Sequence, residues 1–295
     1  CARMLASRDV IGGVKWVETL AGQTDVAKTV EKGKSAYAGP EILGKKLGVI
    51  GLGAVGGPLA NAARKLGMEV YGCDPFISVD AAWRLDSSII HVKNREDIFS
   101  TCDIISVHVP LLDDTRGMIN DETIAMMKDG VIILNFARDA LVDDEAMAEA
   151  LASRKVKCYV TDFPNEKTAN MPGCIAIPHL GASTEESEDN CARMAVQQMM
   201  DYLENGNIRN SVNYPDVSLP HTGDARICIF HKNIPGVLNN ITAIISSQGI
   251  NVENMINKSK KDFAYTILEI GGNIPDNAAE TIASMESVIR VNIIK

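Results

Sequence analysis

Residues 48–56 read Gly-Val-Ile-Gly-Leu-Gly-Ala-Val-Gly, and this stretch decides the fold of the first part of the chain. It places Gly51, Gly53 and Gly56 directly after a short apolar run and before a helical segment. In such a turn the first glycine permits the sharp bend, the second lets the backbone approach a pyrophosphate, and the third lets helix and strand pack closely. Asp74 follows Gly56 by 18 residues, where a carboxylate accepts both ribose hydroxyls and repels a 2′-phosphate. The stretch predicts a dinucleotide site that prefers NAD to NADP.

Short apolar runs alternate with helical segments around this turn. Continuous apolar strands separated by helices are typical of a parallel sheet that is covered on both faces. We therefore predict an α/β, Rossmann-like doubly wound NAD-binding domain over residues 1–184, with a connecting helix at 2–7. The predicted strands are 47–50, 69–72, 103–109, 130–134, 157–161 and 174–177, and the predicted helices are 58–66 and 143–152.

The rest of the chain shows a different order of elements. Residues 183–186 have capping-box spacing and open a long amphipathic helix that ends near Gly206, and residues 210–223 lack periodicity. We predict a helix and linker over 185–223 and a separate domain over 224–295. Its predicted elements are strand 226–231, helix 236–247, strands 250–257 and 263–270, helix 277–284 and strand 288–294, which is the ferredoxin-like order βαββαβ.

Bulk composition excludes several classes of protein. The 295 residues carry a net charge of -9, which argues against a nucleic-acid surface. No apolar run approaches the roughly 18 residues that cross a bilayer, so no membrane partner is expected. The seven cysteines form no CxxC pair, which fits neither a zinc site nor a disulfide framework. We expect no metal and a reducing cytoplasmic location.

Three segments that follow predicted strands carry the side chains needed for chemistry on an alcohol. They are residues 135–143, 161–166 and 177–184, and open α/β sheets bind ligands at this edge. An imidazole such as His179 accepts a hydroxyl proton near neutral pH, and a neighbouring carboxylate orients it. A guanidinium such as that of Arg138 grips a substrate carboxylate through two parallel hydrogen bonds.

Here the sequence resembles the D-2-hydroxyacid dehydrogenase family, and within it the phosphoglycerate dehydrogenases. The motifs that carry the resemblance are GLGAVG (51–56), CDPF (73–76), residues 102–120, NFARDALVD (135–143) and PHLGAST (178–184). It implies NAD-dependent oxidation of 3-phosphoglycerate to 3-phosphohydroxypyruvate, with Arg138 binding substrate, His179 as acid/base and Glu166 as its carboxylate partner. It also implies that the residues contacting NAD, besides the three glycines, include Ala54, Val55, Asp74, Val109, Phe136, Ala137 and Asp162.

The chain departs from the family pattern in the segment that carries Glu166. The usual Glu-Pro step is Glu166-Lys167 here, and the loop after Asp162 is one residue shorter, so Asp162 is a second candidate for the partner of His179. Family members also carry a substrate-domain segment before the predicted helix at 2–7. We therefore expect this chain to bind NAD but to turn over poorly alone.

The last domain contains a second group of candidate binding residues. The run 231–238, His-Lys-Asn-Ile-Pro-Gly-Val-Leu, together with Asn251, resembles the ACT domain, a small amino-acid-binding module. The resemblance implies that His231, Asn233 and Asn251 hold L-serine across a pair of domains, with feedback inhibition of a serine pathway and a homodimer or homotetramer.

Two other functions compete with this interpretation. One is a different enzyme of the same family, such as a glyoxylate, hydroxypyruvate or lactate dehydrogenase, which usually lacks the C-terminal module. The other is a non-catalytic NAD-sensing interaction protein, because such proteins can retain Arg138 and His179. The C-terminal module argues against both.

Overall fold

The computed structural model describes residues 10–272 and 274–294. The chain divides into two compact units, Cys1–Leu180 and Gly181–Lys295, each with its own hydrophobic core. The first boundary therefore falls four residues before the one predicted at 184. The helix predicted at 2–7 lies outside the described residues.

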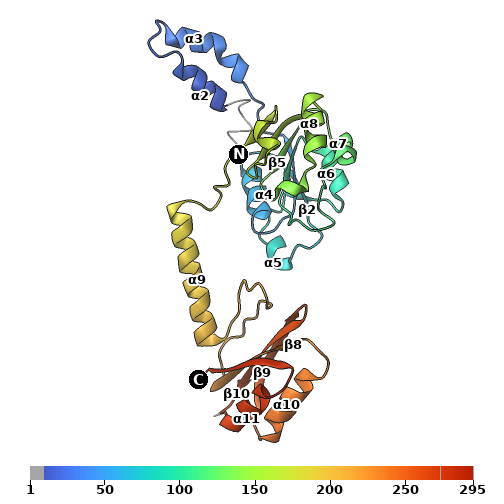
Figure 1. Ribbon diagram of the computed structural model, residues 1–295, viewed down its shortest axis with the longest axis vertical. Helices are drawn as coiled ribbons and strands as arrows, with labels where there is room; N and C mark the ends of the chain where they lie inside the picture. The colour runs from blue at the N-terminus through green and yellow to red at the C-terminus, as the bar shows by residue number, and fades with distance from the viewer. Residues whose placement is uncertain (1–9, 273, 295) are drawn as a thin grey trace. The chain divides into compact units, whose positions relative to one another are not determined.

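The first unit is built on a parallel sheet of seven strands in the order β3-β2-β1-β4-β5-β6-β7 (Figure 1). The order reverses direction between β1 and β4, which is where doubly wound folds bind their ligands. This sheet confirms the predicted α/β class. The strands are β1 (Lys46–Ile50), β2 (Glu69–Cys73), β3 (Ile90–His91), β4 (Ile104–Val107), β5 (Val131–Asn135), β6 (Val156–Thr161) and β7 (Cys174–Ala176).

Helices cover both faces of this sheet because the strands are apolar on both sides. One core includes Phe99, Ile124 and Met147 from three helices, and the other includes Ala60 and Ala63 from α4. The helices of the unit are α2 (Val10–Glu18), α3 (Val26–Gly33), α4 (Gly56–Lys65), α5 (Val79–Ala82), α6 (Arg95–Thr101), α7 (Asp121–Met126) and α8 (Asp144–Ala152), with short 3-10 turns at Lys34–Tyr37, Asp139–Leu141 and Thr168–Asn170.

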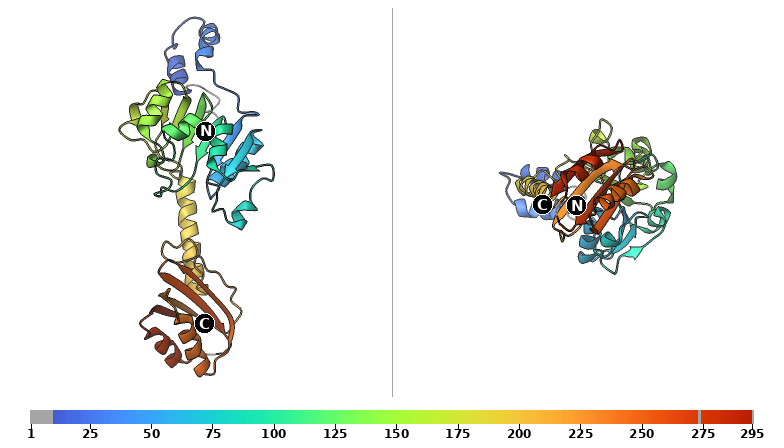
Figure 2. Two further views of the ribbon diagram at one scale, coloured as in Figure 1. Left: turned by 90° about the vertical axis from the view of Figure 1, so that its right-hand side faces the viewer. Right: turned by 90° about the horizontal axis from the view of Figure 1, so that it is seen from below.

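The second unit begins with the long helix α9 (Glu185–Asn205). Its N-cap is Thr184, whose hydroxyl accepts a hydrogen bond from the Ser187 amide at 3.2 Å, so the helix begins one residue later than the predicted capping box. A four-stranded antiparallel sheet follows in the order β11-β8-β10-β9, and α10 and α11 cover one of its faces (Figure 2). The elements are β8 (Ala225–Lys232), α10 (Val237–Ser247), β9 (Val252–Lys260), β10 (Phe263–Ile270), α11 (Asp276–Ala283) and β11 (Val288–Ile294), which is the predicted βαββαβ order.

The segment between α9 and β8 is packed against the sheet and is not a free tether. Ile208 and Val217 are buried and form an isolated antiparallel bridge. The guanidinium of Arg226 in β8 pairs with Glu269 in β10, and both side chains are fully buried. Arg226 also donates to the carbonyl oxygens of Asn205 and Leu219, so one buried ion pair joins α9, the segment and the sheet.

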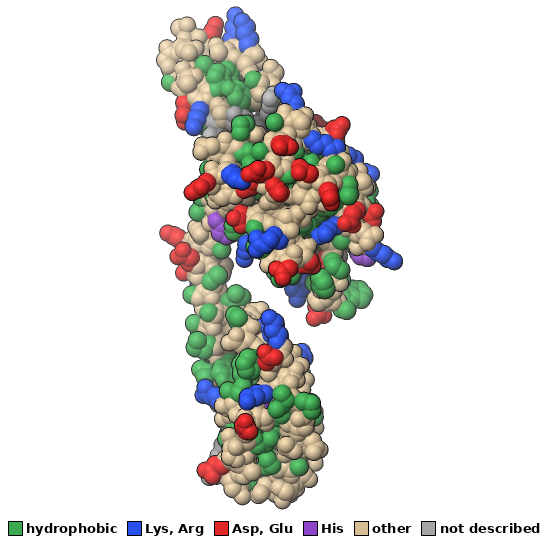
Figure 3. Space-filling model, turned by 45° about the vertical axis from the view of Figure 1, so that its right-hand side comes forward, with side chains coloured by type: hydrophobic (Ala, Val, Ile, Leu, Met, Phe, Trp, Pro, Cys, Tyr) green, Lys and Arg blue, Asp and Glu red, His purple; other side chains and the backbone are tan. Residues whose placement is uncertain are grey.

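The surface of α9 carries many apolar side chains. None of its residues is buried, and Figure 3 shows hydrophobic side chains along the helix. In the same view, acidic and basic side chains are interspersed over the first unit. Among the described helices, none is both long and apolar enough to span a bilayer.

Candidate active site and cofactor cleft

A cleft of about 660 Å³ opens at the carboxyl ends of β1, β2 and β4. It lies at the reversal of strand order, where the glycine-rich turn leads from β1 into α4. Its lining residues include the predicted cofactor-binding residues Gly51, Gly53, Asp74 and Val109.

The three glycines differ in what surrounds them. Gly51 has φ +91°, and a Cβ there would lie 2.6 Å from the His108 carbonyl oxygen. A Cβ at Gly56 would lie 1.9 Å from the Gly51 carbonyl oxygen, so only glycine allows the turn to pack on α4. A Cβ at Gly53 would meet no atom within 4 Å. The open space at Gly53 fits a pyrophosphate that approaches the backbone.

The carboxylate of Asp74 is held at the end of β2 by two backbone amides. Its Oδ2 accepts from the Leu52 amide at 2.8 Å and its Oδ1 accepts from the Phe76 amide at 2.9 Å. The first bond ties the carboxylate to the glycine-rich turn. The side chain therefore lies beside the cleft in the position expected for a ribose-binding acid.

His179 and Asp162 form the closest polar contact among the predicted catalytic residues. Asp162 follows β6 and His179 follows β7, and Nδ1 of His179 lies 3.1 Å from Oδ2 of Asp162. The ring of Phe163 lies 4.6 Å from the imidazole between centroids, at an interplanar angle of 50°. The imidazole is thus in contact on two sides while its side chain remains 59% exposed.

Arg138 lies at the same edge of the sheet, in the loop after β5. Its guanidinium carbon is 5.4 Å from the centroid of the Phe163 ring, and its Nη1 donates to the Ala137 carbonyl oxygen at 2.5 Å. Buried Asn135 braces this loop, because its Nδ2 donates to the Arg138 carbonyl oxygen at 2.7 Å. Asn135 was not predicted as a site residue, although a polar residue that ends an apolar strand is a recognisable signal.

The remaining predicted residues lie at the start of α4 and in the loops after β5 and β6. Glu166 is exposed, and within residues 10–272 and 274–294 no hydrogen bond or ion pair joins it to His179. Ala54 and Val55 lie at the start of α4, while Phe136 and Ala137 precede Arg138 in its loop.

Two buried side-chain atoms in the described part of the chain have no hydrogen-bond partner, and both lie at this edge. They are Nδ1 of His108 and Oδ1 of Asp162. These residues follow β4 and β6, two strand spacings or roughly 10 Å apart. Unpaired buried polar atoms are costly, so each of these two atoms calls for an explanation other than packing.

His108 is neutral in the folded protein. Burial lowers the pKa of its imidazole from 6.5 to about 4. Its Nε2 lies 2.8 Å from the hydroxyl of Ser106, which is fully buried.

The three predicted effector-binding residues do not meet within one chain. His231 is buried, with Nδ1 2.9 Å from the Lys232 carbonyl oxygen and Nε2 2.9 Å from the Thr266 hydroxyl. Asn233 follows the end of β8 that pairs with Phe263, whereas Asn251 precedes the end of β9 that pairs with Ile270. The length of β10 separates them, roughly 24 Å.

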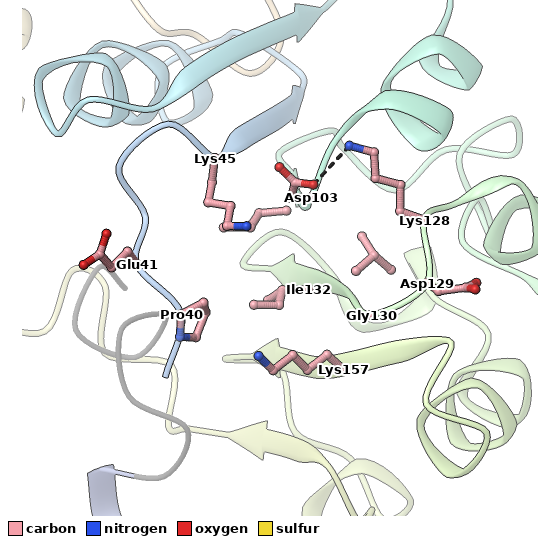
Figure 4. A pocket seen from close by; sticks show the side chains of 11 residues that line it. Pro40, Glu41, Lys45, Asp103, Lys128, Asp129, Gly130, Ile132 and Lys157 are labelled. Carbon is pink, nitrogen blue, oxygen red and sulfur yellow. Dashed lines mark hydrogen bonds and ion pairs between the residues drawn. The ribbon is translucent and has the colours of Figure 1, made fainter. Parts of the chain in front are cut away.

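A smaller hollow of about 170 Å³ lies at the opposite edge of the parallel sheet (Figure 4). Lys45 and Lys157 point into it over Ile132, and Lys128 pairs with Asp103 at 3.0 Å. None of the predicted site residues lines this hollow, so the cleft at the carboxyl edge is the candidate site.

Comparison with known proteins identifies relatives of this chain. D-3-phosphoglycerate dehydrogenase of Haemophilus influenzae is 32% identical over 273 residues, which cover 88% of this chain and 65% of the relative. The enzyme of the same name from Escherichia coli K12 is 31% identical over 274 residues, which cover 88% of this chain and 66% of the relative. This chain therefore spans slightly less than two thirds of the length of these relatives.

Solved structures and a family profile extend the comparison. A glyoxylate reductase from Paecilomyes thermophila is 27% identical, with a TM-score of 0.54 over 72% of this chain and 66% of that chain. The profile described as D-isomer specific 2-hydroxyacid dehydrogenase, NAD binding domain, matches residues 13–181 and confirms the predicted cofactor. That match spans more than half of the sequence, so the chain belongs to the D-isomer specific 2-hydroxyacid dehydrogenase family and carries its NAD-binding domain.

Proposed function

We propose that this protein catalyses the NAD-dependent oxidation of 3-phosphoglycerate to 3-phosphohydroxypyruvate, a first step towards L-serine. The observation that carries the proposal is the contact of 3.1 Å between His179 and Asp162, on the same sheet edge as Arg138 and the glycine-rich turn. The substrate is proposed from the relatives named D-3-phosphoglycerate dehydrogenase.

His179, Asp162 and Arg138 have different roles in the proposed reaction. A carboxylate accepts hydrogen bonds, so Nδ1 of His179 donates to Asp162 and Nε2 is left as the base. Nε2 takes the hydroxyl proton as the C2–H bond breaks and the carbonyl forms. Bound NAD⁺ supplies the acceptor for the hydride. Arg138 binds the carboxylate on the neighbouring carbon and fixes the distance between C2 and the base.

Turnover of several 2-oxo acids tests the reaction. The protein is mixed with NADH and, in separate assays, phosphohydroxypyruvate, hydroxypyruvate, glyoxylate and pyruvate, and loss of absorbance at 340 nm is followed. We expect the highest kcat/KM for phosphohydroxypyruvate, with a loss of roughly 100-fold or more in kcat for His179→Asn. A preference for glyoxylate would favour the activity of the glyoxylate reductase relative.

A non-catalytic NAD-sensing protein is the second candidate function. It would bind NADH with normal affinity and turn over none of the four acids. Because this chain covers about two thirds of the length of its relatives, the same assays are run on the full-length natural protein, whatever its length. NADH binding without turnover in the full-length protein would overturn the proposed reaction.

The proposal includes regulation by L-serine at the second unit, as an ACT domain in a homodimer or homotetramer. The separation of Asn233 from Asn251 along β10 supports a site that is completed by a second copy. Calorimetric titration of L-serine should give saturable binding that Asn251→Ala abolishes. Equal binding of L-serine by Asn251→Ala would reject this site. If an oligomeric wild-type sample did not bind L-serine, the second unit would have a role in assembly only.

The cytoplasm is the proposed compartment. The six cysteines within the described residues, of which Cys73, Cys102 and Cys228 are buried, are all free thiols, and free thiols persist under reducing conditions.

A further inference from the structure

The loop that follows β6 contacts both the candidate base and the candidate carboxylate-binding group. We propose that two neighbouring residues of this loop, Asp162 and Phe163, are positioning residues. Asp162 takes the part of carboxylate partner of His179 in place of Glu166, and Phe163 holds His179 and Arg138 against one aromatic ring. The proposal rests on the dehydrogenase function given above and assigns its geometry to named side chains.

The position of Asp162 favours it over Glu166 as the partner of His179. The Asp162 side chain is 11% exposed and its Oδ2 lies 3.1 Å from Nδ1 of His179. Its other oxygen is buried without a protein partner, so the contact with His179 is the polar contact that this carboxylate makes among the described residues. Glu166, in contrast, is exposed. A buried carboxylate in contact with the ring orients it, whereas an exposed side chain does so weakly.

The hydrogen bonds of the loop account for the exposed position of Glu166. Asn165 accepts hydrogen bonds at 2.9 Å from the amides of Lys167 and Thr168, and its Nδ2 donates to Asp144 at 2.8 Å. These bonds fix a turn against α8, and Glu166 lies at its exposed tip.

Phe163 contacts the two groups from a fixed backbone. Its amide donates to the hydroxyl of buried Thr161 at 3.1 Å, and Pro164 restricts the chain that follows. The centroid of the Phe163 ring lies 4.6 Å from the centroid of the His179 imidazole. It lies 5.4 Å from the guanidinium carbon of Arg138. Both distances are typical of aromatic and cation–π contacts.

The contact of the Phe163 ring with both His179 and Arg138 affects how these two groups meet the substrate. The carboxylate and the hydroxyl of a 2-hydroxy acid are on adjacent carbons, so Arg138 and His179 must act at a fixed separation. The loops that carry them follow β5 and β7, and a side chain that contacts both groups limits their relative movement further. The Phe163 ring is the side chain that contacts both, and loss of alignment between reacting groups lowers rates steeply.

Nitrogen NMR of histidine tests both contacts without depending on turnover. The chain is labelled with ¹⁵N-histidine, and the His179 signals are identified by their loss in His179→Asn. We expect one tautomer with Nδ1 protonated in the wild type, a mixture of tautomers in Asp162→Asn and an unchanged His179 spectrum in Glu166→Gln. A changed His179 tautomer in Glu166→Gln, with Asp162→Asn unaffected, would return the role to Glu166.

The aromatic variants test the ring contact in the same experiment. Phe163→Leu should remove the ring-current shift of the His179 carbon-bound protons, and Phe163→Tyr should retain it. Phe263→Leu, a matched change in the second unit, should leave these protons unaltered. Circular dichroism establishes that each variant is folded, and an unchanged His179 shift in folded Phe163→Leu would overturn the contact.

Kinetics on the full-length protein then separate positioning from a structural role. Phe163→Leu should lower kcat/KM roughly 10- to 100-fold and raise KM as well as lower kcat, because both ends of the substrate lose alignment. Phe163→Tyr should recover activity to within about twofold of the wild type. Equal activities for the leucine and wild-type proteins would reject the positioning role. Absence of NADH binding in the wild type would instead reject the proposed function.

Discussion

The two histidines at the carboxyl edge of the parallel sheet, His108 and His179, differ in how far they are exposed to solvent. His179 is exposed on one side and oriented on the other, which suits a base that meets substrate. His108 is neutral because burial lowers the pKa of its imidazole to about 4. The two histidines therefore differ in their access to substrate and solvent, because one side chain is exposed and the other is surrounded by protein.

The low pKa of His108 predicts a pH dependence of stability. Between pH 6.5 and about 4 the unfolded chain binds a proton at this residue that the folded chain does not, so stability rises with pH across this window and falls as pH drops through it. The loss between pH 6.5 and 4 should reach about 3 kcal/mol. His108→Gln should flatten the dependence in urea unfolding followed by circular dichroism. The exposed His91→Gln is the matched control and should retain the wild-type slope.

The sequence singles out Arg138 and His179 because each lies in a distinctive motif after an apolar strand, and the structure places both at the carboxyl edge of the sheet. The carboxylate partner was left open between Glu166 and Asp162. Which carboxylate reaches an imidazole depends on the length and internal hydrogen bonds of a loop, and the side chain of Asn165 accepts two of those hydrogen bonds here. For the same reason, the sequence did not predict the aromatic contact of Phe163.

At the scale of elements, the strands of the parallel sheet were predictable because they are continuous apolar runs. The short strand Ile90–His91 was missed because both residues are exposed. The helix Arg95–Thr101 was missed because only Ile98 and Phe99 on it are buried. The packing of residues 206–223 was missed since tertiary contacts, including the Ile208–Val217 bridge, replace periodicity there.

The buried Arg226–Glu269 pair predicts a large effect of a single substitution in the second unit. Burial alone would raise the pKa of Glu269, but hydrogen bonds from Gly223, Thr222 and Arg226 more than offset it, and the pKa lies below its usual value. Arg226→Met leaves this charge without its cation and should cost about 3–5 kcal/mol in the free energy of unfolding.

Two further variants make that measurement decisive. The double variant Arg226→Met/Glu269→Leu should recover much of the loss in urea unfolding, because no uncompensated charge remains. Lys34→Ala, which breaks the exposed Lys34–Glu31 pair, should cost less than about 1 kcal/mol. If Arg226→Met costs no more than Lys34→Ala, the pair does not hold these elements together.

At the scale of the whole molecule, the division into two units with separate cores predicts that their stabilities respond to different ligands. NADH at about 100 times its Kd should stabilise the first unit by about 2.7 kcal/mol. Hydrogen exchange measured by mass spectrometry should show slower exchange in peptides from residues 46–180 and unchanged exchange in peptides from 225–294. Equal slowing in both would show that the units unfold together.

The partners of the Arg226–Glu269 pair also limit the positions at which a gene fusion can transfer the second unit to another protein. A gene fusion that joined a new partner at Asp224 would deliver the sheet with a buried guanidinium whose acceptors, the carbonyl oxygens of Asn205 and Leu219, had been left behind. A fusion inside α9, upstream of its last turn, would carry every partner of the pair. The part of the chain that can be transferred as one module is therefore longer than its βαββαβ core. Chimeras that are cut within α9 should fold, whereas those cut at Asp224 should not.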